Sequence, residues 1–93
     1  MTAFVGGNLE QLAALTATFA REGEQVERLS RAIDANLAQT QWTGLVAEEF
    51  RRRWNEEFQP MLLNLQEALL EASHVVAARR DALDQATNLY GAG

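Results

Sequence analysis

The sequence predicts an all-α fold, an antiparallel hairpin of two long amphipathic helices, and three observations support this prediction. Strong helix formers, namely Ala, Leu, Glu, Gln and Arg, dominate the composition. The 93 residues include 6 Gly and 1 Pro, whereas a strand-rich fold needs many turn residues. Apolar residues recur at helical spacing along two long segments. The length suits one domain, residues 1–93, and the 47% hydrophobic content is typical of a folded chain.

The first helix is expected at about residues 9–39. Asn8 follows Gly6-Gly7 and can cap the helix by accepting a hydrogen bond from a backbone N–H two or three residues on. An apolar stripe then repeats every seven residues, at Leu12, Phe19, Val26 and Ile33, and Leu15, Leu29 and Leu37 widen it. The opposite face is expected to carry Glu10, Arg21, Glu24, Arg28, Arg31 and Asp34. Gly23 should weaken this helix by about 1 kcal/mol relative to Ala.

A turn is expected at residues 40–44, because Thr40, Trp42 and Thr43 are poor helix formers and Gly44 is a helix breaker. A second helix should follow at about residues 45–88. Its apolar rows are Leu62, Leu69, Val76, Leu83 and Tyr90; Met61, Ala68, Val75, Ala82 and Leu89; and Leu65, Ala72 and Ala86. Upstream, Ala47, Phe50, Trp54 and Phe58 continue an apolar face at steps of three and four residues.

Pro60 lies inside this second helix, where it removes a backbone donor and crowds the preceding turn. A kink is predicted near residues 56–60, because the apolar face stays in register on both sides of the proline. The tail that begins at Tyr90 is expected to fray.

The widths of the apolar stripes also predict an assembly. Helices of about 65 Å and about 45 Å joined by a short loop must fold back on each other. Three adjacent heptad positions of the second helix are apolar, whereas one partner helix covers about two. We therefore expect the hairpin to dimerise into an elongated four-helix bundle, which covers the remaining apolar surface.

The charge pattern excludes several classes of partner. Net charge is −5, from 8 basic and 13 acidic residues, so no basic face for nucleic acid is expected. The one basic run, residues 51–53, is flanked by glutamates, which indicates a solvated face with ion pairs such as Glu49–Arg53 and Glu48–Arg52. No apolar run reaches the roughly 18 residues of a membrane span, and the N-terminus does not look like a Sec signal peptide.

The sequence also indicates that the protein is not an enzyme and holds no metal or cofactor. Cys is absent, and His74 is the single histidine, so neither a metal set nor a thiolate site can be assembled. Asp81 and Asp84 share a helix face, but a solvated helix end explains them as well. Ser30 and Ser73 form no recognisable pattern of nucleophile, base and orienting group in the sequence.

Trp42 and Trp54 allow two interpretations, and both stay open at this level. Both rings could plug the end of the hairpin, in which case a spare carbonyl of the turn would accept the indole N–H. Alternatively, an aromatic ring beside the turn could be exposed to a partner protein.

Trp42-Thr43-Gly44 between two amphipathic helices resembles the Trp-Xaa-Gly family, the small early-secreted-antigen-like proteins of type VII secretion. The similarity to actinobacterial members extends from the opening Phe4-Val5-Gly6-Gly7-Asn8-Leu9-Glu10-Gln11-Leu12 over nearly the whole chain. Its spacing is carried by Trp42, Gly44, Ala47, Phe50, Arg51, Trp54, Phe58, Pro60, Leu62, Leu65 and Leu69.

The resemblance implies a non-enzymatic protein that leaves the cytoplasm as a folded dimer, by a route that needs no signal peptide. The implied partners are a second copy or a family paralogue, and an FtsK/SpoIIIE-type secretion ATPase. Trp42 and Gly44 would form a notch, and a tail on the partner subunit, with the pattern Tyr-x-x-x-Asp/Glu, would complete the export signal.

The end of the chain departs from this pattern. Tyr90 is followed by three residues, so the acid would fall one position past Gly93. The signal could be truncated, a heterodimeric partner could supply it, or Tyr90 could simply complete the apolar row. An alternative function is therefore kept, a non-secreted helical chaperone or partner of a larger Trp-Xaa-Gly toxin protein. Binding to a membrane surface is disfavoured by the acidic balance and the absence of Lys.

Overall fold

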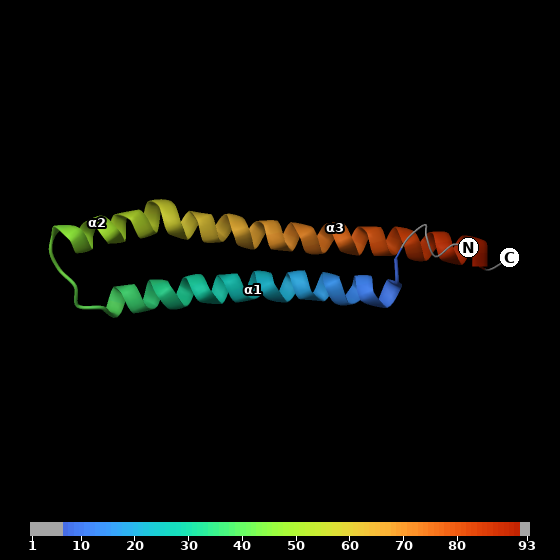
Figure 1. Ribbon diagram of the computed structural model, residues 1–93, viewed down its shortest axis with the longest axis horizontal. Helices are drawn as coiled ribbons and strands as arrows, with labels where there is room; N and C mark the ends of the chain where they lie inside the picture. Colours follow the sequence, from blue (N-terminus) through green and yellow to red (C-terminus); the bar gives the residue numbers. More distant parts are fainter. Residues whose placement is uncertain (1–6, 92–93) are drawn as a thin grey trace.

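The computed structural model describes residues 7–91, with side chains through residue 87, and confirms the predicted all-α hairpin. Helix α1 (Leu9–Gln39) forms the first rod of the hairpin. The second rod is antiparallel to it and consists of α2 (Leu45–Arg53), the π-helical turn η2 (Trp54–Phe58) and α3 (Gln59–Gly91). Figure 1 shows the two rods side by side, joined by a single loop at one end. The molecule measures 72 × 18 × 15 Å, so a single layer of contacts between two rods holds it together.

The cap predicted at Asn8 is present. Its Oδ1 accepts a hydrogen bond from the backbone N–H of Gln11 at 2.9 Å, which satisfies one of the free donors at the start of α1. At the other end, Thr40 adopts an extended backbone (φ −77°, ψ 125°) and donates its N–H to the carbonyl of Leu37. The helix therefore ends at Gln39, and the loop 40–44 follows.

The backbone widens just before Pro60, in the region where the sequence predicts a kink. Proline has no N–H to donate, and its ring would crowd the carbonyl of Glu56, four residues earlier. In η2 the N–H of Gln59 instead donates to the carbonyl of Trp54, five residues back. The π-helical turn is the local solution to the proline, and helical structure continues on both sides of it.

Small and polar residues mark the line along which the two rods approach. Gly23 is buried on α1, and a Cβ added there would lie 3.4 Å from Cδ2 of Leu70. Ser73 is buried on α3 and donates its Oγ–H to the carbonyl of Thr16 at 3.0 Å. Gly23 therefore stands at a close approach between the helices, a role that its helix propensity alone does not predict.

The apolar stripes of both rods lie on one side of this line. Phe19 and Val26 stand four before and three after Gly23, and Leu69 and Val76 stand at the same offsets from Ser73. In an antiparallel pair, equal offsets fall on the same side of the hairpin. Leu15, Leu29 and Leu65 lie one step further out, and all three are exposed in the single chain. We call this surface the apolar flank.

The single hairpin buries very little of its apolar surface. Among the residues with described side chains, the buried apolar ones are Ala47 and Trp54. The stripe residues Leu12, Phe19, Val26, Ile33, Phe58, Leu62, Leu69, Val76 and Leu83 are half-buried, and Phe50 and Leu65 are exposed. No large side chain in this part of the chain is fully enclosed, so one hairpin alone lacks the interior of an ordinary domain.

Candidate functional site

The loop 40–44 holds the Trp-Xaa-Gly motif in a defined conformation. The N–H of Trp42 donates to the carbonyl of Thr40 at 3.0 Å, and the N–H of Glu48 donates to the carbonyl of Gly44 at 3.0 Å, which starts α2. Gly44 has φ 109° and ψ 175°, a region that essentially Gly alone occupies. An added Cβ would meet nothing within 4 Å, so backbone conformation, and not space, requires glycine here.

Arg51 fastens this loop to α2. Its Nη1–H donates to the carbonyl of Trp42 at 2.7 Å and its Nη2–H donates to the carbonyl of Thr40 at 3.1 Å. The planar guanidinium fork spans two carbonyls that are two residues apart in the chain. The carbonyl of Thr40 thus accepts from both Arg51 and the Trp42 N–H.

An aromatic cluster, made of Trp42, Phe50 and Phe58, lines the same end of the hairpin. The ring centroids of Trp42 and Phe50 are 5.8 Å apart at 44°, and those of Phe50 and Phe58 are 6.3 Å apart at 38°. Both geometries are typical of favourable tilted aromatic pairs. Trp42 is 39% exposed despite these contacts, and the neighbouring Leu45 is 85% exposed. The loop end therefore offers apolar groups to solvent.

The two tryptophans have different environments. Trp54 is 5% exposed, and its Nε1–H donates to Oδ1 of Asp34 on α1 at 3.2 Å. Trp54 thus fits the interpretation of a buried ring that plugs the end of the hairpin, whereas Trp42 fits the interpretation of a ring exposed beside the turn. The acceptor expected from the sequence, a carbonyl of the turn, is wrong for Trp54. Asp34 is exposed, as predicted, but its carboxylate lies near enough to the interface to reach the indole.

Two arginines of the basic run, residues 51–53, form ion pairs that differ from those predicted from the sequence. Arg52 pairs with Glu49 at 2.6 Å and with Glu56 at 2.8 Å, and Arg53 pairs with Glu57 at 3.1 Å. The expected pairs Glu49–Arg53 and Glu48–Arg52 are therefore wrong, because Arg52 binds Glu49 and Glu56, and Arg53 binds Glu57, one turn further along. The guanidinium of Arg53 also lies 4.9 Å from the ring centre of Phe58, a cation–π contact.

These exposed pairs shift the ionisation of their members. A hydrogen bond from Arg52 lowers the pKa of Glu49, and hydrogen bonds to Glu49 and Glu56 raise the pKa of Arg52. Since both side chains are solvated, these shifts mark local pairing and not a reactive site.

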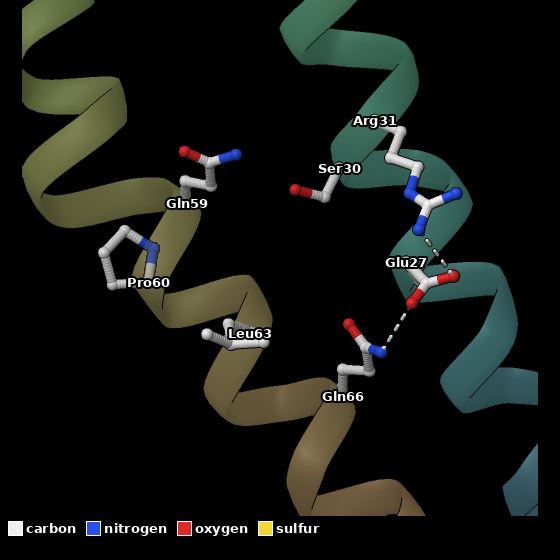
Figure 2. Close-up of a pocket in the computed structure, with 7 residues that line it drawn as sticks. All are labelled: Glu27, Ser30, Arg31, Gln59, Pro60, Leu63 and Gln66. Carbon is white, nitrogen blue, oxygen red and sulfur yellow. Dashed lines mark hydrogen bonds and ion pairs between the residues drawn. The ribbon is translucent and has the colours of Figure 1, made fainter.

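A shallow depression lies between α1 and the start of α3, beside η2. Figure 2 shows its lining side chains, Glu27, Ser30, Arg31, Gln59, Pro60, Leu63 and Gln66. Its Glu27 accepts from Nε2 of Gln66 at 3.1 Å and pairs with Arg31 at 3.5 Å. The two charged groups of the depression thus pair within α1, and the neutral amide of Gln66 reaches Glu27 from α3.

The residues that the sequence singles out for chemistry have ordinary structural environments where the structure describes their contacts. His74 is exposed, and the hydroxyl of Ser73 is used in the interhelical bond to Thr16. Within residues 7–91, no three His, Cys, Asp or Glu side chains gather into a set that could hold a metal ion. In the same part of the chain, no helix is both long and apolar enough to traverse a bilayer.

Part of the expected export signal, and part of the segment that carries the family resemblance, lie outside the described side chains. Tyr90 lies in α3, which continues to Gly91, so the fraying expected from Tyr90 onward is wrong for residues 90 and 91. The side chain of Tyr90 is not described, and residues 4–6 are outside the described part of the chain. Comparison with protein-family models, with curated proteins and with solved structures finds no match to this chain. Membership of the Trp-Xaa-Gly family therefore stays a prediction from the motif and its spacing.

Proposed function

We propose that this protein is a non-enzymatic helical hairpin that serves as a substrate or adaptor of a type VII secretion system and is exported as a folded dimer. One observation carries the proposal: Trp42-Thr43-Gly44 forms the loop of an antiparallel hairpin, and the Trp42 ring is exposed there. In the family that the sequence resembles, this motif forms a recognition notch. A held but solvated aromatic ring suits recognition by another protein.

The apolar flank supports the pairing part of the proposal. Leu29 and Leu65 are 50% and 47% exposed on the same side of the hairpin, and most of the stripe between them is half-buried. Isolated soluble chains seldom leave a continuous apolar strip of this kind in water. A second hairpin, from another copy or from a paralogue, would cover the strip and complete a four-helix bundle.

The export proposal is tested by secretion of the tagged full chain in the source organism, with and without the secretion ATPase. We expect the protein in the culture supernatant to depend on the ATPase and to fall sharply in Trp42→Ala. The matched control is Leu63→Ala, which truncates a 51% exposed apolar side chain of α3 away from the loop. Supernatant levels that are independent of the ATPase would contradict the proposal.

The same exposed flank favours a second candidate, a non-secreted partner that covers part of a larger helical protein. Sedimentation of the purified chain separates the two functions. A stable, folded dimer supports self-pairing. A monomer that aggregates, and that becomes soluble only when co-expressed with a larger neighbour, supports the second candidate.

A further inference from the structure

We propose that Arg51 is a positioning residue for Trp42: its guanidinium fixes the loop 40–44 against α2 and so sets the direction in which the indole faces a partner. The inference rests on the proposed function only in its last step, that a partner binds Trp42. The positioning itself follows from contacts within this chain.

The first contact set is the fork of Arg51. It binds the carbonyls of Trp42 and Thr40, at 2.7 Å and 3.1 Å, so one rigid planar group joins both sides of the peptide that leads into Trp42. The bonds from this loop to the flanking helices hold its two ends: Thr40 donates to carbonyls of α1, and the carbonyl of Gly44 accepts from the N–H of Glu48. Without the fork, the main restraint on the peptide would be the bond from the Trp42 N–H to Thr40.

The second contact set is the ring of Phe50, the residue that precedes Arg51. Its centroid lies 5.8 Å from that of Trp42. Adjacent residues of α2 therefore hold Trp42 at two points, the backbone carbonyl by Arg51 and the indole by Phe50. Because both come from one helix, the indole is oriented by α2 and not by the loop alone.

The neighbouring arginines show that this role is specific to position 51. Arg52 and Arg53 pair with glutamates on their own rod. Within the described residues, Arg51 has no carboxylate partner and is half-buried, one helical turn after the fully buried Ala47 and three residues before Trp54. A charged residue on the inward side of α2 is explained by the loop carbonyls that it binds.

The test compares Arg51→Lys with Arg52→Lys in the full chain. Lysine keeps the charge but offers no planar fork, so it cannot reproduce both bonds. We expect Arg51→Lys to speed hydrogen exchange of the Trp42 backbone amide about tenfold, the effect of losing one charge-assisted bond, and to lower the heteronuclear NOE of the Trp42 indole. Arg52→Lys should leave the exchange rate and the heteronuclear NOE within twofold of their wild-type values. Unchanged values in Arg51→Lys, or equal changes in both variants, would overturn the proposal.

A measurement on the unmodified protein covers the case in which Arg51→Lys fails to fold. The Nη resonances of Arg51 should show slow rotation of the guanidinium, and a freely rotating group would refute the fork. Secretion of the folded variant then separates the two proposals. If Trp42 becomes mobile and export is unchanged, the positioning role stands, and the step in which a partner depends on the orientation of Trp42 fails. If export of the unmodified chain is independent of the ATPase, the proposed function fails and the positioning role still stands. If Trp42 remains fixed, the positioning role fails.

Discussion

The indole N–H of Trp54 donates to Oδ1 of Asp34 across 3.2 Å, and this bond ties η2 to the last third of α1. Trp54 is one of the two buried apolar residues among those described, and the bond satisfies the single polar atom of its ring. The pair lies in the half of the hairpin that ends in the loop 40–44. It therefore anchors the end of the molecule from which Trp42 projects.

Asp34→Ala should destabilise the fold by about 1–3 kcal/mol, because the buried indole N–H loses its acceptor. Asp34→Asn should cost less, since the amide oxygen can still accept. Urea unfolding monitored by circular dichroism measures both values, with the solvated Asp84→Ala as control, expected within about 0.5 kcal/mol of wild type. Equal losses for Asp34→Ala and Asp84→Ala would show that the bond contributes nothing to stability.

Gly44→Ala should destabilise the hairpin by about 1–3 kcal/mol, because a residue with a Cβ is strained at φ 109°, ψ 175°. Gly44→Asn should cost a similar amount, since this region lies outside the left-handed helical conformation that Asn tolerates. The same unfolding assay measures both variants. A neutral Gly44→Ala would mean that the loop relaxes to another conformation without loss.

Gly23→Ala should stabilise the hairpin, in contrast to Gly44→Ala. The new Cβ would meet Cδ2 of Leu70 at 3.4 Å, an ordinary contact distance, so the gain in helix propensity of up to about 1 kcal/mol should be retained. Gly23→Leu should instead destabilise, because its longer side chain has no space at this close approach. Thermal melts of the two variants decide the matter, and a lower melting temperature for Gly23→Ala would show that the interface does not tolerate even one methyl group.

Periodicity was sufficient to predict the helical hairpin, because stripes at Leu12, Phe19, Val26 and Leu69, Val76 define an inward face without knowledge of contacts. It could not predict that Pro60 is accommodated by a π-helical turn, since a kinked α-helix satisfies the same pattern. Periodicity likewise could not predict that Trp42 is exposed and Trp54 is buried, because the two residues differ in tertiary contacts and not in type.

Residue type alone does not predict the roles of Arg51 and Asp34, because charged residues are expected on the solvated face of a helix. Their positions carried a usable signal. Arg51 stands between Ala47 and Trp54, at steps of four and three residues, so it occupies the inward face of α2. A guanidinium at such a position needs acceptors, and the nearby loop carbonyls are the acceptors available.

The pairing of Glu49 with Arg52 predicts a small pH dependence of stability. The folded pKa of Glu49 is lowered, so its contribution is present above the unfolded pKa and is lost as the pH falls through the folded value. The difference in melting temperature between wild type and Glu49→Gln should be small and constant from about pH 7 to about pH 5, and should close below about pH 4. High salt should abolish it at every pH, because the pair is solvated. A difference that grows on acidification would contradict the assignment.

Leu65 and Leu63 give a matched test of the apolar flank. They are 47% and 51% exposed in the single hairpin and lie two residues apart on α3. Leu65 lies on the side that carries the stripes, whereas Leu63 lines the polar depression on the other side. If a second hairpin covers the flank, Leu65→Asp places a charge in the seam and should shift the dimer to monomer or unfolded chain. Leu63→Asp should leave the assembly intact. Sedimentation equilibrium measures the difference, and equal behaviour of the two variants would mean that the flank is not where the hairpins meet.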